Sequence, residues 1–370
     1  MNGSSERPVL EAVAMSGGVD SSVAALLRIR AGARVVGLTM KLWDSGCDGE
    51  APDKACCTAD HALDARRVCD ALGAPHYTLD LRDDFRRDVV DDFVSEYLAG
   101  RTPNPCVRCN THLKWDALWR HARALGCRFL STGHYARVVE GPFGPQLRAG
   151  RDPSKDQSYF LWGIPRELLA VTRFPLGDLE KTATRDLARE AALPTAAKSE
   201  SQDICFVPGG DYRELVRARQ PDAPLLRPGP ILGPGGVPLG EHEGLACYTL
   251  GQRRGVGVAW TEPLYVTGID VASNTLHLGV AAQLQVSALV LENENWLLAD
   301  GEPMPESVTV RMRYRSGAKP CTVERAPGSP TRIVLAEPAL APAAGQSMVV
   351  YDGDRVLGGG ILARAEGVGG

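Results

Sequence analysis

The chain has 370 residues, of which 44% are hydrophobic and 23% charged, and its formal net charge is −4 at pH 7. This length is too great for one ordinary hydrophobic core, so roughly two or three domains are expected, and the slightly acidic balance excludes a globally cationic nucleic-acid-binding protein. No apolar run is long enough to span a membrane, and the N-terminus MNGSSERP carries no apolar segment of a secretory signal. We therefore expect a cytoplasmic protein without a membrane partner.

The first half of the chain alternates strands with helices. The β-branched run RVVGLTMKLW at 34–43 is typical of a buried parallel strand, and 83–98 carries Phe and Val residues at helical spacing. Repeated βα units predict a parallel sheet with right-handed crossovers, whose ligands bind at the carboxyl ends of the strands. The predicted strands are 9–15, 34–43, 76–81 and 128–132, and the predicted helices are 20–31, 58–72, 83–98 and 113–125.

The segment AVAMSGGVDSSVAALL at 12–27 indicates an anion-binding turn between the first strand and the first helix. Glycines let the backbone approach an anion closely, and the N–H groups at the start of a helix favour phosphate. The turn has neither the lysine of a GxxxxGKS/T loop nor the spacing of GxGxxG. The pattern SGGxDS resembles instead the pyrophosphate loop (PP-loop) of the ATP pyrophosphatases, which cleave ATP between its α and β phosphates and adenylate an oxygen of the substrate.

The character of the sequence changes after Cys205. Residues 157–193 are predicted to be mostly helical and 209–219 to hold one short helix, whereas 226–240 is dense in Pro and Gly and is not expected to be regular. Short alternating strands then indicate small β domains, the last of them a barrel, and 366–370 is expected to be disordered. The predicted strands are 265–271, 275–280, 288–291, 308–314, 332–336, 347–351 and 356–362.

Two places among the ten cysteines suggest chemistry, whereas most of the others are expected to be small buried residues. Cys106 and Cys109 form a CxxC pair in RTPNPCVRCN, just before a basic helix, and Cys205 lies far along the chain. Pro103 and Pro105 predict an extended loop around the pair and not a helix. Adenylation turns a carbonyl oxygen into a leaving group, which sulfur carried as a cysteine persulfide can then replace.

A set of motifs follows in a fixed order between residues 12 and 362. They are MSGGVDSS, TPNPCVRCN, STGHYARV, KDQSYFL, SQDICFV, YTLGQRRGVG, RYR and GQSMVVYDGDRVLGGGI. Together they resemble the bacterial tRNA-specific 2-thiouridylase family, which makes 2-thiouridine at the wobble uridine of the tRNAs for Lys, Glu and Gln with ATP, Mg²⁺ and a relayed persulfide. The resemblance implies an α/β parallel-sheet PP-loop ATP pyrophosphatase domain at 1–206, a small central β-rich domain at 207–283 and a C-terminal β-barrel at 284–370.

The resemblance also implies roles for the thiols and for the residues around the target base. Cys205 would carry a persulfide delivered by a cysteine desulfurase or a sulfur-relay protein, and Cys109 would release the sulfur by forming a disulfide with Cys205. The flipped uridine would meet Asn104, Pro105 and Cys106.

Further residues are implied to bind ATP or tRNA. Met40 and Gly133 would line the adenosine side of the ATP site. The residues implied to hold the ATP phosphates are Ala14, Met15, Ser16, Gly17, Gly18, Val19, Asp20 and Ser21. The residues implied to contact tRNA are His134, Lys155, Asp156, Gln157, Arg313, Tyr314 and Gln346.

Position 106 departs from the family pattern, because many members have Asp where this chain has Cys106. With Cys106, Cys109 and Cys205 at one site, three thiolates could hold a [4Fe-4S] cluster whose open iron binds sulfide, so the sequence leaves a persulfide relay and a cluster both open. Two other classes of protein are also open. The first is an amide-forming ATP pyrophosphatase, which needs no thiols, so the placing of Cys109 and Cys205 counts against it. The second is a non-catalytic RNA-binding or sulfur-carrier protein, which does not need the intact Asp20 and Ser21, so their presence counts against it.

Overall fold

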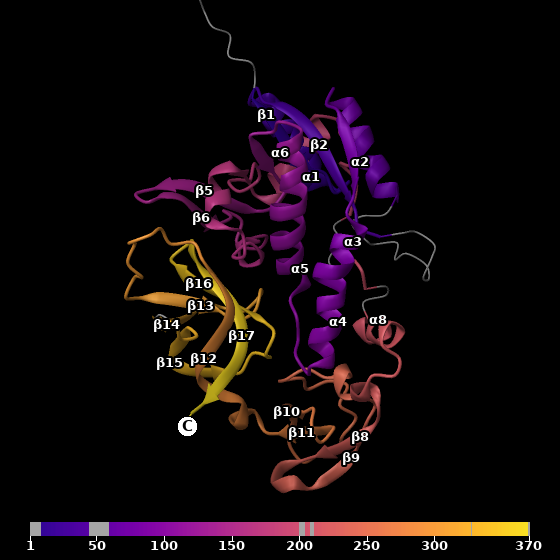
Figure 1. Ribbon diagram of the computed structural model, residues 1–370, viewed down its shortest axis with the longest axis vertical. Coiled ribbons are helices and arrows are strands. Elements are labelled where there is room, and N and C mark those ends of the chain that lie inside the picture. The colour runs from indigo at the N-terminus through magenta and orange to yellow at the C-terminus, as the bar shows by residue number, and fades with distance from the viewer. Residues whose placement is uncertain (1–8, 44–58, 200–203, 208–210, 327, 369–370) are drawn as a thin grey trace, which may run out of the picture. The chain divides into compact units, whose positions relative to one another are not determined.

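The computed structural model describes residues 9–43, 59–199, 204–207, 211–326 and 328–368 (Figure 1). Contacts divide the chain into two compact units. The first comprises Met1–Asp88, Cys106–Gly210 and Asp354–Val356, and the second comprises Val89–Pro105, Asp211–Gly353 and Leu357–Gly370. The domain boundaries after residues 206 and 283 stay predictions. No helix of the described residues is long and apolar enough to cross a membrane.

The first unit contains the predicted parallel sheet, with strand order β3-β2-β1-β4-β7. Every neighbouring pair is parallel, and β1 is central, with Val13 opposite Gly37 of β2 and Ser131 of β4. Apolar side chains of β1 and β2 pack against α1 and α2, which buries one face of the sheet. The strands are β1 (Leu10–Ala14), β2 (Arg34–Lys41), β3 (His76–Asp80), β4 (Phe129–Ser131) and β7 (Thr172–Arg173), and the helices are α1 (Val19–Arg30), α2 (Ala59–Ala71) and α7 (Lys181–Glu190). The strands and helices predicted up to residue 98 are confirmed, except that the start of the 58–72 helix lies outside the described residues.

The segment around the CxxC pair is helical, so the prediction of an extended loop up to Asn110 is wrong. Helix α5 (Pro105–Arg108) continues into a π-helix, η2 (Cys109–Leu118), and then into α6 (Trp119–Ala124). Proline is well tolerated at the first helical position, because its missing N–H is not needed there and its φ is already helical. Pro105 therefore starts the helix, and Cys106 and Cys109 share one helical face.

The prediction that 157–193 is mostly helical is also wrong. Before this segment, β5 (Ala136–Gly141) and β6 (Gly144–Ala149) form a hairpin that was not predicted. The segment 157–193 itself holds two short 3₁₀ turns, η3 (Ser158–Phe160) and η4 (Arg166–Val171), which are followed by β7. Helix α7 is the only longer helix in this segment. Buried Asp156 organises the first turn, because its carboxylate accepts hydrogen bonds from the N–H groups of Gly150 and Ser158. These side-chain bonds offer the backbone an alternative to a helix.

In the second unit, a sheet with strand order β10-β11-β8-β9 precedes the barrel. The prediction that 226–240 is irregular is wrong, because β8 (Gly229–Leu232) pairs with β9 (Pro238–His242) across a turn with two positive-φ glycines, Gly235 and Gly236. The strands β10 (Tyr265–Asp270) and β11 (Thr275–Gly279) and the helices α4 (Asp91–Leu98) and α8 (Tyr212–Arg219) complete this part. Helix α4 continues the predicted 83–98 helix from α3 (Arg82–Phe85) and the π-turn η1 (Arg86–Val90).

The C-terminal strands form the predicted barrel. They follow the order β12-β15-β14-β13-β16-β17, and pairing of β12 with β17 closes it around a core that includes Leu289, Val310, Ile333 and Met348. Strand β14 was not predicted, and β17 runs through Gly367, so the disorder expected from residue 366 is wrong for the part described. The strands are β12 (Gln285–Trp296), β13 (Val308–Arg311), β14 (Lys319–Glu324), β15 (Arg332–Leu340), β16 (Ser347–Asp352) and β17 (Arg355–Gly367).

Candidate functional site

The glycine turn follows the carboxyl end of the central strand. Strand β1 ends at Ala14, and α1 starts at Val19 with Gly18 as an N-cap that makes no side-chain capping bond. Ser21 closes the turn, because its Oγ accepts a hydrogen bond from the N–H of Ser16 at 3.2 Å and donates to the carbonyl of Gly18 at 3.1 Å. The predicted phosphate-binding residues thus form one compact loop at the N-terminus of a helix, where backbone N–H groups and the helix dipole favour an anion.

Glycine is required at two positions of this loop and its surroundings. Gly17 has a φ of +71°, and a Cβ there would lie 2.2 Å from the carbonyl oxygen of His61. Gly133 follows β4, the neighbour of β1, and a Cβ there would lie 2.8 Å from both the carbonyl carbon of Asp20 and the N of Ser21. The strand order reverses between β1 and β4, which is where an open α/β sheet binds its ligands. Half-buried Met40 is the second-last residue of β2, on the other side of β1.

Replacing Gly133 should therefore damage the glycine turn. We expect Gly133→Ala to weaken ATP binding at least about tenfold, since the methyl group must displace the backbone of Asp20 and Ser21. Isothermal titration calorimetry with ATP would measure this. Gly126→Ala is the control for a glycine whose Cβ would meet nothing within 4 Å, although its φ of +83° gives it a strain cost of its own. Equal ATP affinity of Gly133→Ala and the parent would contradict the placement of the site.

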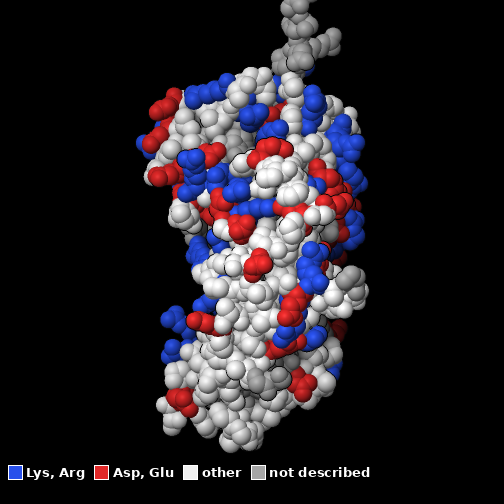
Figure 2. Space-filling model, turned by 90° about the vertical axis from the view of Figure 1, so that its left-hand side faces the viewer, with Lys and Arg blue, Asp and Glu red and all other residues white. Residues whose placement is uncertain are grey.

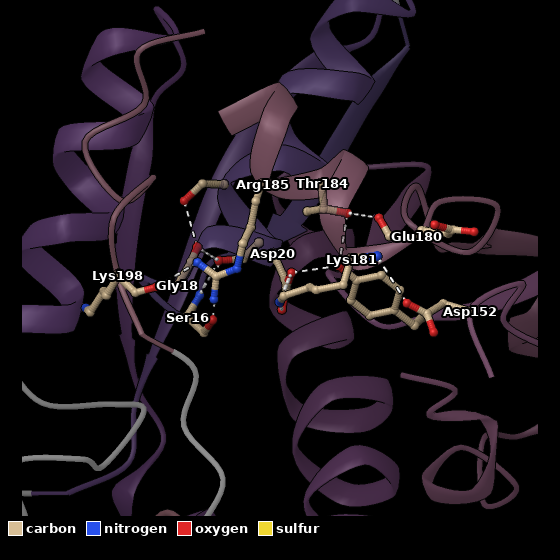
Figure 3. A network of polar contacts seen from close by, with 12 residues as sticks. Ser16, Gly18, Asp20, Asp152, Glu180, Lys181, Thr184, Arg185 and Lys198 are labelled. Atoms are coloured by element: carbon tan, nitrogen blue, oxygen red, sulfur yellow. Dashed lines mark hydrogen bonds and ion pairs between the residues drawn. The ribbon is translucent and has the colours of Figure 1, made fainter. Parts of the chain in front are cut away.

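Asp20 lies in a network of polar contacts at the start of α1 (Figure 3). The Nζ of Lys181 donates to both carboxylate oxygens, at 2.7 and 2.8 Å, and the hydroxyl of Tyr135 lies 3.0 Å from Oδ1. Lys181 is only 8% exposed, so its ammonium group depends on this carboxylate for compensation. The tyrosine hydroxyl also lies 3.0 Å from that of Thr184 on α7. Helix α7 therefore holds the Asp20 side chain in one position.

A second lysine contacts the other end of the turn. The Nζ of Lys198 donates to the carbonyl of Gly17 at 3.0 Å and to Asp64 on α2 at 2.8 Å. Burial acts to raise the pKa of Asp64, but the Lys198 and Arg67 cations outweigh it and lower that pKa below its usual value. Sequence reasoning missed Lys181 and Lys198, because both come from chain segments remote from the turn and neither belongs to a local motif. Both ammonium groups lie at the turn, and each is paired with a carboxylate, Lys181 with Asp20 and Lys198 with Asp64.

His134 belongs to a hydrogen-bonded chain that leads to the CxxC helix. Its Nε2 lies 3.2 Å from the Nζ of Lys114, which also donates to the side-chain oxygen of Asn110 at 2.8 Å. Burial, and then the charge of Lys114, hold the pKa of His134 well below its usual range, so its imidazole is neutral. Because an ammonium group can only donate, Nε2 accepts, and Nδ1–H donates to the hydroxyl of Thr132, 2.7 Å away. The chain links the β4 end to the residue after Cys109.

The thiols differ in exposure. Cys106 is exposed near the start of α5, whereas Cys109 and Cys205 are half-buried. Phe206 anchors the segment of Cys205, because its ring packs edge-on against the ring of Phe85, with the two ring centroids 5.5 Å apart. The described cysteines include all three, and they form no disulfide. Among the same described residues, no three His, Cys, Asp or Glu side chains lie close enough together to hold a metal ion.

The remaining predicted residues fall into two kinds of environment. Asp156 is buried, and the side-chain oxygen of Gln157 accepts a hydrogen bond from the N–H of Tyr135 at 3.0 Å, so both side chains organise their own loop. Arg313 is exposed on the barrel, where its guanidinium also reaches the carbonyl of Ala341 at 3.0 Å. The half-buried residues of the predicted set are Asn104, Lys155, Tyr314 and Gln346, and Pro105 is buried.

Comparisons with known proteins cover almost the whole chain. Residues 11–209 match the family model described as a tRNA methyl transferase HUP domain, 224–280 a tRNA methyl transferase PRC-barrel domain, and 286–362 an aminomethyltransferase beta-barrel domain. The tRNA-specific 2-thiouridylase MnmA of Magnetococcus marinus is 46% identical over 96% of this chain and 99% of its own length. The enzyme of the same name from Geobacter metallireducens is 44% identical over 95% of this chain and 96% of its own.

Among solved structures, a 4-thiouridine synthetase–RNA complex with bound ATP matches 58% of this chain and 51% of its own, with 17% identity and a TM-score of 0.33. A likeness of that size carries no functional argument. The matches to 2-thiouridylases are of a different order, because they extend over nearly the full length of both chains at more than 40% identity. The chain therefore belongs to the tRNA-specific 2-thiouridylase family.

Proposed function

We propose that this protein is an ATP-dependent tRNA sulfurtransferase that converts the wobble uridine of the tRNAs for Lys, Glu and Gln to 2-thiouridine. The observation that carries the proposal is the loop from Ser16 to Ser21, which meets Gly133 at the point where the strand order reverses. Family membership supports tRNA as the partner and ATP as the co-substrate. The sulfur donor is proposed to be a cysteine desulfurase or a sulfur-relay protein.

In the first step, the C2 oxygen of the uridine attacks the α-phosphorus of ATP and pyrophosphate leaves. The N–H groups of the glycine turn, the hydroxyls of Ser16 and Ser21, and the ammonium groups of Lys181 and Lys198 supply donors for phosphate oxygens. Their close grouping supports this role, since preorganised donors stabilise the charge that develops on the leaving group. Mg²⁺, when bound, would neutralise the pyrophosphate, and Asp20 is the carboxylate in the turn that suits it.

In the second step, sulfur replaces the activated oxygen. The terminal sulfur of a Cys205 persulfide bonds to C2, and AMP leaves with the former C2 oxygen. The thiolate of Cys109 attacks the Sγ of Cys205, which breaks the persulfide S–S bond and forms a Cys109–Cys205 disulfide. An external thiol then reduces this disulfide. We favour this relay over an iron–sulfur cluster because it needs only Cys109 and Cys205, whereas a cluster needs at least one further ligand and no three potential ligands of the described residues lie together.

The test of this proposal is tRNA-dependent chemistry. Purified protein is mixed with ATP, Mg²⁺, a persulfide donor and unmodified tRNA for Lys, Glu or Gln. We expect pyrophosphate release that requires tRNA, and 2-thiouridine at the wobble position by mass spectrometry of nuclease fragments. Pyrophosphate release without tRNA would instead favour an amide-forming ATP pyrophosphatase. Tight tRNA binding without pyrophosphate would favour a non-catalytic RNA-binding or sulfur-carrier protein.

The proposed RNA surface predicts a salt-dependent loss of affinity. On the face drawn in Figure 2, basic and acidic side chains are intermixed in the upper part and sparse in the lower part, and no uniform basic field is seen. Lys155→Ala and Arg313→Ala should each weaken tRNA binding and reduce the slope of log K against log salt by about one, because each removes one phosphate contact. Filter binding over a range of salt concentrations measures the slope. If both variants match the parent at every concentration, these residues do not contact tRNA.

A further inference from the structure

The segment 99–104 leads directly into Pro105 and the CxxC helix, and we call it the strap. In the second unit, the barrel turn before β16 holds it along its backbone. The N–H of Thr102 donates to the carbonyl of Ala344 at 2.8 Å, and the side-chain Nε2 of Gln346 donates to the carbonyls of Thr102 and Pro103 at 2.8 and 3.3 Å. The amide group of Gln346 thus uses both of its N–H bonds on the strap.

An ion-pair cluster fixes the strap at its other end. The guanidinium of Arg101 contacts Glu96 of α4 at 2.7 Å and also Glu292 of β12. The side chain of Arg101 is 21% exposed, which makes this cluster less screened by water than most surface pairs. The hydroxyl of Thr102 adds a contact of 3.2 Å to that of Thr249, in the loop before β10. The strap is therefore tied to both β parts of the second unit.

The turn and the strap approach each other too closely for any side chain between them. Gly345 has a φ of +89°, and a Cβ there would lie 2.9 Å from both the carbonyl oxygen of Thr102 and the carboxylate of Glu96. A residue other than glycine would have to push the strap away. The contact is thus built into both chain segments, and the barrel fixes the backbone that immediately precedes Asn104.

We propose that Gln346 and Glu292 are positioning residues that hold the strap so that Asn104 and Pro105 can receive the flipped uridine. The proposal rests on the function proposed above, and it changes the role expected for Gln346. A direct contact with RNA through Nε2 would require this side chain to give up its hydrogen bonds to Thr102 and Pro103. The barrel would then serve catalysis by holding the target-base segment in place, in addition to any RNA that it binds.

The test compares Gln346→Ala and Glu292→Gln with the parent and with Glu324→Gln. The control breaks a comparable barrel ion pair, Glu324 with Arg332, which does not involve the strap. Three quantities are measured: tRNA affinity over a range of salt concentrations, the single-turnover rate of adenylation at saturating tRNA, and base flipping. Flipping is followed by the fluorescence of 2-aminopurine placed next to the wobble base, which rises when its stacking neighbour leaves.

We expect Gln346→Ala and Glu292→Gln to lower the flipping signal and to slow adenylation at saturating tRNA by about tenfold, the effect of losing one or two hydrogen bonds. The tRNA affinity of both variants should stay within about twofold of the parent, a difference below about 0.5 kcal/mol, and its salt slope should not change. The control Glu324→Gln should match the parent in all three quantities. Weaker tRNA affinity with an unchanged adenylation rate at saturating tRNA would overturn the proposal and would make Gln346 an RNA contact. No change in any of the three quantities would also overturn the proposal. If Gln346→Ala does not fold, Glu292→Gln decides. A parent without tRNA-dependent pyrophosphate release would refute the proposed function instead.

Discussion

Asp20→Asn is expected to reduce tRNA-dependent pyrophosphate release at least about 100-fold while tRNA affinity stays unchanged, because losing one preorganised charged contact in an active site typically costs about 3 kcal/mol or more of transition-state stabilisation. The amide keeps the size of the side chain and its contact with Tyr135. It loses the negative charge that suits Mg²⁺ and compensates Lys181. Stopped-flow detection of pyrophosphate measures the rate, and filter binding measures the affinity.

A pair of further variants separates chemistry from folding. Asp20→Ala leaves the ammonium of Lys181, which is 8% exposed, without its carboxylate, and we expect a loss of up to about 3 kcal/mol in the free energy of unfolding. Asp20→Ala combined with Lys181→Met removes both charges and should regain most of that stability in urea titrations. Activity should stay absent in the double variant. If any of these variants released pyrophosphate at the parental rate, Asp20 would have no part in adenylation.

The position of the glycine turn could be predicted from the sequence because its signals are local. The β-branched run at 34–43 predicts a buried strand, and Gly17 with Gly18 between a short apolar strand and a helix predicts the turn. Parallel connectivity then places every strand end at one edge of the sheet, which is why Met40 and Gly133 were expected near the turn. The structure agrees closely at Gly133, where the distance to the Asp20 backbone leaves no space for a side chain.

The partners of the turn could not be predicted, because they depend on distances in space. The Nζ groups of Lys181 and Lys198 contact Asp20 and Gly17 from more than a hundred residues further along the chain, and no spacing rule connects them. Local rules also gave a wrong prediction for proline, which breaks a helix in its interior but favours its first position. Pro105 was interpreted as a helix breaker, but it stands at the one helical position that favours proline. The tRNA contact that the resemblance implies for Gln346 stays a prediction, and in the structure the amide group of Gln346 holds the strap.

The thiols give the second large effect. If the relay operates, Cys205→Ala and Cys109→Ala should each abolish 2-thiouridine formation, and the parent should accumulate a Cys109–Cys205 disulfide after one turnover without reductant. The Cys106→Asp variant should keep the activity of the parent, because in a relay Cys106 would only be a binding or basic substitute for the Asp that many family members have. Cys127→Ala is the matched control, since burial, with a contribution from Glu11, raises the pKa of its thiol to about 11 and keeps it unreactive. Peptide mapping by mass spectrometry identifies the disulfide.

Cys106→Asp alone does not discriminate between the relay and a cluster, because a carboxylate can also ligate iron. The deciding comparison is between iron content and single-turnover thiolation in protein that has been freed of metal and loaded with persulfide on Cys205. Under the proposed relay we expect thiolation without iron, in an amount that follows the persulfide loaded, because the relay needs only Cys109 and Cys205. If a cluster operates, we expect a different result. Iron and activity would then be lost together in each of the variants Cys106→Ala, Cys109→Ala and Cys205→Ala. Thiolation strictly proportional to bound iron would therefore reject the relay.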